Sequence, residues 1–240
     1  MPSHRGPHPE DPELFAEGQI PRLRAAIHDL SWLRTRGYGD ASSLKLVGDR
    51  YRLRRRQRNV VARSACSDDE KEDRTARRVA VDDLANTWLE VDGFNVLIRL
   101  EGALGGAYIF RGRDEAYRDV DPVAGTYRLV QETTPAIRAL RRTASSLHLK
   151  GVRWWLDAHV SNVGRLQRRL ESEGTSSMGW EVCIESDVDV ALIESGRPVA
   201  TSDSEILNQK GPWCAIEPAA FDRMGGSVHV LDLRPEATEE

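Results

Sequence analysis

The sequence has little cysteine and no long apolar run, and each shortage excludes a class of protein. Only three cysteines occur, Cys66, Cys183 and Cys214, and they form no CxxC pair. This pattern excludes a disulfide framework and a zinc ribbon, and it favours a reducing compartment. No apolar stretch approaches the roughly 18 residues that cross a bilayer, and the N-terminal residues lack the apolar segment of a secretory signal. We therefore expect a cytoplasmic protein with no membrane partner.

Lysine is also scarce, since it occurs only at positions 45, 71, 150 and 210, and arginine carries most of the positive charge. The net charge of −4 does not by itself indicate a nucleic-acid-binding protein. The charge is unevenly distributed, however, because residues 50–63 contain seven arginines and no acidic residue. Arginine is the better bidentate partner for phosphate, so we predict that Arg54, Arg55 and Arg58 bind substrate phosphates. The alternative is a solvated helix face that pairs with the acidic residues at 68–73.

The pattern of apolar residues divides the chain into three parts. Residues 1–19 are rich in proline, histidine and acidic residues, and we predict that they form a disordered tail. Residues 20–80 show only helical spacing and are predicted to form a helical N-terminal module. Residues 84–234 alternate strands with helices, which is typical of an α/β domain with a mostly parallel sheet. The strands are expected at 87–91, 107–110, 152–156, 180–184, 198–201, 213–216 and 228–233.

Aspartates follow several of these predicted strands. Asp92, Asp157 and Asp203 come at strand ends, and Asp187 and Asp189 begin a short helix after another strand. In open parallel sheets ligands bind outside the carboxyl ends of the strands, so these carboxylates are expected to converge. Like charges that lie close together need neutralisation, and Mg²⁺ or Mn²⁺ prefers such oxygen ligands. The alternative is that the aspartates serve as helix N-caps and turn residues.

Four of these acidic segments also carry a resemblance. Asp92-Gly93-Phe94-Asn95 after an apolar strand resembles the opening signature of PIN-like nucleases of the NYN group. Later segments are similar to that group's remaining acidic motifs in the expected order, namely Trp155-Leu156-Asp157, Ser186-Asp187-Val188-Asp189-Val190-Ala191-Leu192 and Ala200-Thr201-Ser202-Asp203-Ser204. The resemblance implies a PIN/NYN-like fold, in which a mostly parallel sheet is flanked by helices, and a metal-dependent endoribonuclease activity.

The same resemblance assigns roles to individual residues. It implies that Asp92, Asp157, Asp189 and Asp203 are catalytic carboxylates that hold Mg²⁺ or Mn²⁺, with Asp187 as a supporting ligand. Asn95 would orient Asp92 or contact the substrate, which is RNA rather than DNA. The chain departs from the group at Ser204-Glu205, where a further aspartate is common and Glu205 is a candidate substitute. It also carries a long insert whose polar string, residues 111–121, is either a substrate loop or, as we favour, an internal ion-pair network.

The wider chain resembles an uncharacterised prokaryotic family of unknown function that pairs a helical N-terminal module with such a nuclease-like domain. The resemblance covers roughly residues 20–234. It is carried by Asp29-Leu30, Arg36-Gly37-Tyr38, Leu46-Val47-Gly48-Asp49-Arg50-Tyr51, Gln57-Arg58 and Val160-Ser161-Asn162-Val163-Gly164-Arg165.

Several polar residues follow Asp157 and are candidates for substrate binding. Ser161 and Asn162 are expected to line the same sheet edge, and Arg165 lies on the helix that follows. A capping role for Ser161 and an ordinary surface position for Arg165 are the alternatives. The six histidines show no HExxH motif, which argues against zinc catalysis.

Three functions are compatible with these residues. The first is a Mg²⁺- or Mn²⁺-dependent endoribonuclease that hydrolyses phosphodiester bonds. The second is a non-catalytic protein that binds nucleic acid or another partner on a PIN-like fold. The third, a small phosphatase, is weakened because Asp92-Gly93-Phe94-Asn95 lacks the DxDx[TV] pattern.

Overall fold

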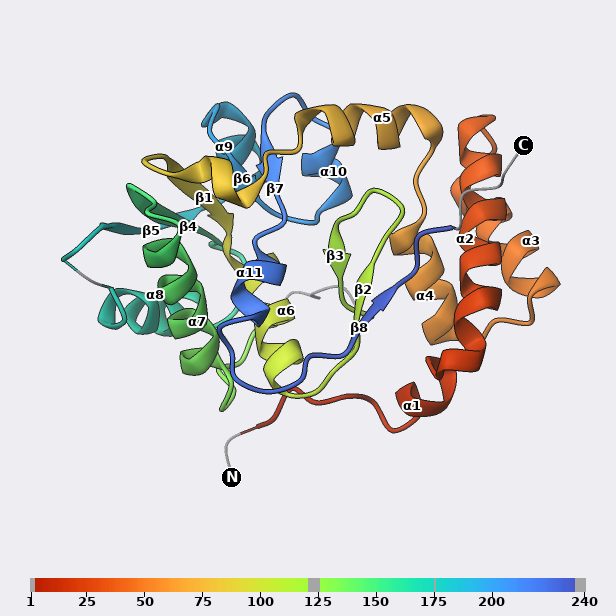
Figure 1. Ribbon diagram of the computed structural model, residues 1–240, viewed down its shortest axis with the longest axis horizontal. Coiled ribbons are helices and arrows are strands. Elements are labelled where there is room, and N and C mark those ends of the chain that lie inside the picture. The colour runs from red at the N-terminus through yellow and green to blue at the C-terminus, as the bar shows by residue number, and fades with distance from the viewer. Residues whose placement is uncertain (1–2, 121–125, 175, 236–240) are drawn as a thin grey trace. The chain divides into compact units, whose positions relative to one another are not determined.

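The computed structural model describes residues 3–120, 126–174 and 176–235 (Figure 1). The chain divides into two compact units, each built from three separate segments. We call them the sheet unit, residues 1–6, 77–106 and 123–228, and the helical unit, residues 7–76, 107–122 and 229–240.

The sheet unit is built around a five-stranded sheet whose neighbouring strands all pair in parallel. The strands, in the spatial order β5-β4-β1-β6-β7, are β5(Gly179–Glu185), β4(Gly151–Asp157), β1(Trp88–Asp92), β6(Val199–Ala200) and β7(Trp213–Cys214). Its helices are η2(Val81–Leu84), α6(Gly93–Leu104), α7(Thr133–Ser146), α8(Val163–Ser172), α9(Val188–Glu194), α10(Ser204–Leu207) and α11(Glu217–Phe221). The prediction of a mostly parallel sheet flanked by helices is therefore confirmed.

The strand order reverses beside β1. From β1 the chain proceeds to β4 and then β5 on one side, and it returns to β6 and β7 on the other side. In parallel α/β sheets, such a reversal opens a crevice outside the carboxyl ends of the strands, where ligands bind. Asp92 ends β1 and Asp203 closely follows β6, so both residues lie at this point.

Alternation along β1 and β4 separates an apolar face from a polar one. Leu89 and Val91 of β1 and Trp154 of β4 are fully buried. The intervening Glu90 is buried as well, and it accepts a 2.6 Å hydrogen bond from the indole nitrogen of Trp155. The two adjacent tryptophans therefore face opposite sides of the sheet, with Trp154 in the core.

Close packing of α6 against β4 places the end of β1. The helix begins directly after Asp92, and a Cβ atom at Gly93 would lie 2.5 Å from the carbonyl oxygen of Trp155. Only glycine allows the backbones to approach so closely. The local sequence Asp92-Gly93 therefore fixes the first catalytic candidate at the carboxyl edge of the sheet.

The helical unit combines a group of helices with a small sheet. Its helices are α1(Asp11–Leu14), η1(Glu17–Gln19), α2(Ile20–Thr35), α3(Asp40–Arg50), α4(Arg55–Ser64) and α5(Asp68–Arg77), the last of which ends at the unit boundary. The sheet has the order β3-β2-β8 and contains β3(Tyr117–Arg118), β2(Ile109–Arg111) and β8(Val230–Asp232). Leu23, Ile27 and Leu30 of α2 are fully buried in its core with Phe110 and Leu233.

Two predicted boundaries are corrected. Residues 1–19 are not a disordered tail throughout, because α1 and η1 form and Phe15 is buried. The buried Asp11 carboxylate anchors this segment by accepting a 2.7 Å hydrogen bond from Arg56. The domain predicted over 84–234 is not continuous either, because the strands expected at 107–110 and 228–233 pair with each other in the helical unit.

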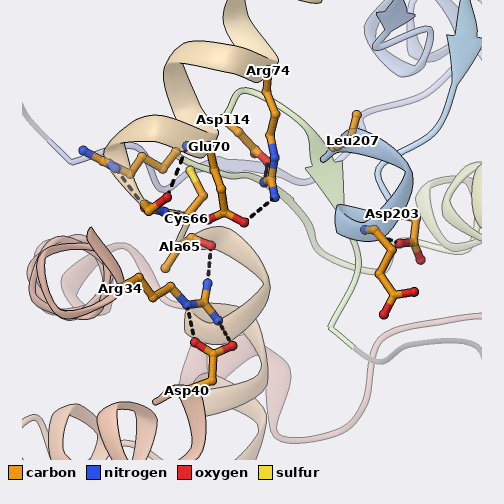
Figure 2. A network of polar contacts seen from close by, with 12 residues as sticks. Arg34, Asp40, Ala65, Cys66, Glu70, Arg74, Asp114, Asp203 and Leu207 are labelled. Carbon is orange, nitrogen blue, oxygen red and sulfur yellow. Dashed lines mark hydrogen bonds and ion pairs between the residues drawn. The ribbon is translucent and has the colours of Figure 1, made fainter. Parts of the chain in front are cut away.

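The polar insert of residues 111–120 forms an ion-pair network within the helical unit, as Figure 2 shows in part. Asp114 is buried and accepts hydrogen bonds from Arg74 at 2.6 Å and from Arg118 at 2.7 Å. Both arginines are themselves buried. For these residues the ion-pair alternative is confirmed, while Asp121 lies outside the described residues.

Among the described residues, no helix combines the length and apolar character that a membrane crossing requires.

Candidate functional site

The predicted acidic residues all lie on the sheet unit where strands end. Asp92 and Asp157 are the last residues of β1 and β4. Asp187 is the N-cap of α9 after β5, Asp189 lies in the first turn of that helix, and Asp203 is the N-cap of α10 after β6. Since these strands run in parallel, all five carboxylates belong to the carboxyl edge of one sheet.

Asp92 is the residue at this edge whose protonation is most strongly affected. Withdrawal from solvent, together with the smaller effect of the charges of Asp203 and Asp189, raises the pKa of its carboxyl group to about 7. A 2.7 Å hydrogen bond from the hydroxyl of Thr201 and the positive charge of Arg99 act in the opposite direction. The carboxylate of Asp92 is therefore incompletely compensated by the protein itself.

Asp189 experiences the other acidic residues of the edge. Burial raises its pKa first, followed by the negative charges of Asp203, Glu205, Asp187 and Asp157. Together with the effect of Asp203 and Asp189 on Asp92, this links every predicted carboxylate electrostatically to at least one other. Glu205, the candidate substitute for a further aspartate, belongs to the same group.

Three of the aspartates also make local capping or turn contacts. The Oδ1 atom of Asp157 accepts a 2.7 Å bond from the backbone N–H of His159, and that of Asp203 accepts a 2.8 Å bond from Glu205. Asp187 accepts a 3.2 Å bond from Val190 in the same way. The capping alternative is therefore correct in part. Each of these bonds uses Oδ1 alone, so capping and a second role are compatible.

The donor atoms at this edge are of the type that binds a hard cation, but their positions in this structure do not enclose one. All the donors are carboxylate oxygens, the type that Mg²⁺ and Mn²⁺ prefer. As the side chains stand, however, no three His, Cys, Asp or Glu residues within 3–120, 126–174 and 176–235 are arranged to hold one metal ion. The donor set fits a divalent cation, and side-chain rearrangement would be needed to close the site around it.

Asn95 positions the segment that follows β6. Its Oδ1 atom accepts hydrogen bonds from the backbone N–H of Ser202 at 3.1 Å and from the Ser202 hydroxyl at 3.2 Å. It also accepts a hydrogen bond from Arg99. Because Thr201, one residue earlier, donates to Asp92, Asn95 acts on Asp92 indirectly by fixing this segment.

Arg99 and Glu217 were not predicted from the sequence. Arg99 is 1% exposed and pairs with the equally buried Glu217, with 2.5 Å between Nη2 and Oε1. The same guanidinium donates a 2.6 Å hydrogen bond to Ser202. The sequence did contain a signal for this pair, namely an arginine within the apolar helix α6. A charge on a buried helix face requires a partner. The identity of that partner, more than a hundred residues away, was not available.

The predicted substrate-binding residues are divided between the two units. Ser161, Asn162 and Arg165 are exposed at the start of α8, after Asp157. Asn162 has a left-handed backbone conformation, with a φ angle of 65°, and donates a 3.1 Å hydrogen bond to the carbonyl of Tyr127, which indicates a structural contribution.

Arg54, Arg55 and Arg58 belong to the helical unit. Arg54 and Arg55 are exposed. Arg58 forms contacts within the helical unit, since its guanidinium lies 2.8 Å from the carboxylate of Asp49 and donates a hydrogen bond to the carbonyl of Leu53. Its acidic partner is therefore Asp49 rather than a residue of the predicted stretch 68–73.

Comparison with known proteins defines the family. Residues 81–219 match the family described as "Domain of unknown function (DUF5616)", and the chain belongs to this family. Residues 22–77 match a second family, described as "Protein of unknown function (DUF434)".

A particular relative extends this relationship over both units. An uncharacterised protein of Methanocaldococcus jannaschii is 31% identical over 189 residues, which cover 78% of this chain and 90% of that protein. No solved structure matches the chain. The resemblance to an uncharacterised prokaryotic family is thus confirmed, and the resemblance to PIN/NYN nucleases stays a prediction.

Proposed function

We propose that this protein is a Mg²⁺- or Mn²⁺-dependent endoribonuclease with a PIN/NYN-like sheet unit. The observation that carries the proposal is the gathering of aspartates from four strand ends of one parallel sheet. Capping accounts for single hydrogen bonds of three of them. It does not account for acidic residues following β1, β4, β5 and β6 at the same edge, where their charges oppose one another.

In this proposal the carboxylates of Asp92, Asp157, Asp189 and Asp203 hold the cation, with Asp187 in support. A bound divalent metal supplies an activated water and offsets negative charge on the phosphoryl oxygens. The remaining chemistry belongs to positioning. Thr201 holds Oδ2 of Asp92 through its hydroxyl.

Asn95 and the buried Arg99 support that arrangement, and Glu217 pairs with Arg99. Asn95 and Arg99 contact Ser202 through its backbone N–H and its hydroxyl, and thereby fix Thr201 and Asp203 on either side of it. In the same proposal Arg165, exposed on the helix after Asp157, binds a phosphate of the RNA strand.

The decisive experiment is a cleavage assay with single-stranded RNA, structured RNA and single-stranded DNA, each in Mn²⁺, Mg²⁺ or EDTA. Asp157→Asn is the test variant, because the Asp157 carboxylate would hold the metal. Asp83→Asn is the matched control. Asp83 is an exposed aspartate in η2, which precedes β1 and is therefore not at its carboxyl end.

We expect RNA cleavage that requires metal, persists in Asp83→Asn and falls by at least about a hundredfold in Asp157→Asn. Cleavage that survives in Asp157→Asn would indicate a contaminating nuclease and contradict the proposal. RNA binding without cleavage by any form of the folded protein would favour the non-catalytic nucleic-acid-binding function instead.

A further inference from the structure

Helices α2 and α3 form a hairpin with an unusual exposed side. They pack against each other and are joined by residues 36–39. Two contacts with Asp29 of α2 define this side of the hairpin. Tyr51 donates a 2.8 Å hydrogen bond to its carboxylate, and Arg50 lies 3.4 Å from it. The two helices of an antiparallel hairpin run in opposite directions. Trp32, one turn after Asp29 in α2, and Leu46, one turn before Arg50 in α3, therefore lie at the same level along the hairpin.

Large apolar side chains of the hairpin are exposed rather than buried. Trp32 is 47% exposed, Leu46 is 62% exposed, and Tyr38 in the connecting segment is 58% exposed. Across the described residues only Val190 and Val230 are other large apolar residues of this kind. The guanidinium of Arg36 lies 3.6 Å from the centre of the Trp32 ring, in a cation–π contact. We refer to Trp32, Arg36, Tyr38, Leu46 and Arg50 as the aromatic–arginine surface.

The segment that carries this surface is strongly positive. Residues 20–58 contain eleven lysines and arginines and three aspartates, although the whole chain has a net charge of −4. Each aspartate has a partner within the segment. Asp40 accepts hydrogen bonds from Arg34 at 3.0 and 3.1 Å, as Figure 2 shows.

The other two aspartates are paired as well, Asp49 with Lys45 and Arg58, and Asp29 with Arg50 and Tyr51. Arg52 and Arg55 are exposed, and neither forms an ion pair with another described residue. The positive charge that remains available is therefore carried by the same segment as the exposed aromatic rings.

We propose that the aromatic–arginine surface binds single-stranded RNA, with Trp32 and Tyr38 stacking on unpaired bases and Arg50, Arg52 and Arg55 holding phosphates. Single-strand-binding proteins combine these two features, aromatic platforms and a cationic track. Duplex RNA does not offer its bases for stacking. The excess of positive charge favours a polyanion over an apolar protein partner. The choice of RNA over DNA rests on the proposed function, whereas the binding itself does not require cleavage.

The test uses the full chain carrying Asp157→Asn, in EDTA, so that binding is measured without turnover. Fluorescence anisotropy follows a labelled oligouridine strand and an RNA duplex. We expect Trp32→Leu, which keeps the apolar bulk and removes the ring, to weaken single-strand binding about tenfold. Trp32→Phe should remain within about threefold of the parent.

Two further variants separate charge from stacking. Replacing Arg52 and Arg55 by glutamine should reduce the salt dependence of binding by about one to two in the log–log slope. Val230→Ala, at an exposed apolar residue of β8, is the matched control and should bind like the parent. Circular dichroism confirms that each variant is folded.

Three results would overturn this proposal. They are no RNA binding by the parent, unchanged binding by Trp32→Leu combined with Tyr38→Leu, or equal binding of single strand and duplex. A parent dimer that Trp32→Leu dissociates, with no effect on RNA, would instead assign the surface to self-association. Failure of the proposed nuclease is distinguishable, because the protein with Asp157 intact would then bind the strand through Trp32 and leave it uncut in Mn²⁺.

Discussion

Two aspartates withdrawn from water, one in each unit, have opposite electrostatic surroundings. Asp114 in the helical unit lies between Arg74 and Arg118, whose charges and hydrogen bonds hold its pKa far below the usual range despite burial. Asp92 in the sheet unit has a hydroxyl donor, but burial and then the charges of nearby carboxylates raise its pKa to about 7. The first is a neutralised structural residue. The second is a carboxylate whose negative charge is not fully compensated, and such perturbed groups are typical of functional sites.

The largest loss of stability is expected when the ion pairs of Asp114 are removed. Asp114→Ala leaves Arg74 and Arg118 buried without their shared partner, and should destabilise the helical unit by about 3–5 kcal/mol. Peptide-resolved hydrogen exchange would localise the loss to that unit. Asp69→Asn, at an exposed residue of α5, is the control and should change stability by less than about 0.5 kcal/mol. Equal effects of the two variants would contradict the structural role of Asp114.

The buried Arg99–Glu217 pair offers a second test. Arg99→Met leaves Glu217 buried without a cation and should cost about 3–4 kcal/mol in the free energy of unfolding. Combining it with Glu217→Leu should recover most of this loss, because the uncompensated charge is then removed. Urea denaturation of the two single variants and the double variant measures the coupling. Additive losses would show that the two residues do not act as a pair.

A pH titration should distinguish the two aspartates by sign. The pKa of Asp92 is raised in the folded state, so the folded protein binds the proton more tightly than the unfolded chain does. Its contribution therefore favours folding at low pH and is lost as the pH rises from about 4 to 7. Asp114 has a depressed folded pKa. Its contribution is therefore complete above the unfolded value and is lost only as the pH falls below it.

The stability of the sheet unit is measured by hydrogen exchange as a function of pH. Asp92 keeps some exposure to solvent, so we expect a decrease of about 1–3 kcal/mol between pH 4 and 7. In Asp92→Asn this dependence should be largely absent. A parent profile that matches that of Asp92→Asn would show that Asp92 has an ordinary pKa.

The smallest expected effect is produced by the cation itself. At neutral pH, Mn²⁺ or Mg²⁺ should stabilise the sheet unit by about 1–2 kcal/mol, because a ligand that binds only the folded state shifts the equilibrium towards it. Asp92→Asn should lose this response while Asp114→Ala, where folded, keeps it. Stabilisation that is equal in parent and Asp92→Asn would place the cation elsewhere on the protein.

Much of the sheet unit was predictable because its signals are local. Leu89 and Val91 alternate with polar residues in β1, and the parallel-sheet rule then places Asp92 and Asp157 at one edge. The electrostatic linkage of each of them to Asp189 follows from that placement. Alternation along β4 is a local pattern as well, and it is sufficient to place the two adjacent tryptophans on opposite sides of the sheet.

The remaining features depend on distant partners. The apolar pattern of residues 228–233 indicates a strand but does not specify its sheet, so β8 was assigned to the wrong unit. The segment around α1 looked too polar to fold alone, and its ordering requires the ion pair between Asp11 and Arg56. Arg99 in an apolar helix indicated that a buried partner exists, but it did not identify Glu217. In each case the missing information was a contact between residues far apart in the chain.

The interleaving of the two units has a consequence for biosynthesis. Most of the helical unit, residues 7–76, is translated before the main segments of the sheet unit, yet β8, which pairs with β2, is translated after them. Its N-terminal helices must therefore wait, with Leu23 and Ile27 lacking Leu233 as a neighbour, while the whole sheet unit is synthesised. The strands of the sheet unit all precede β8, so that unit is free to fold first. Folding order during translation is thus expected to be the reverse of the order of synthesis.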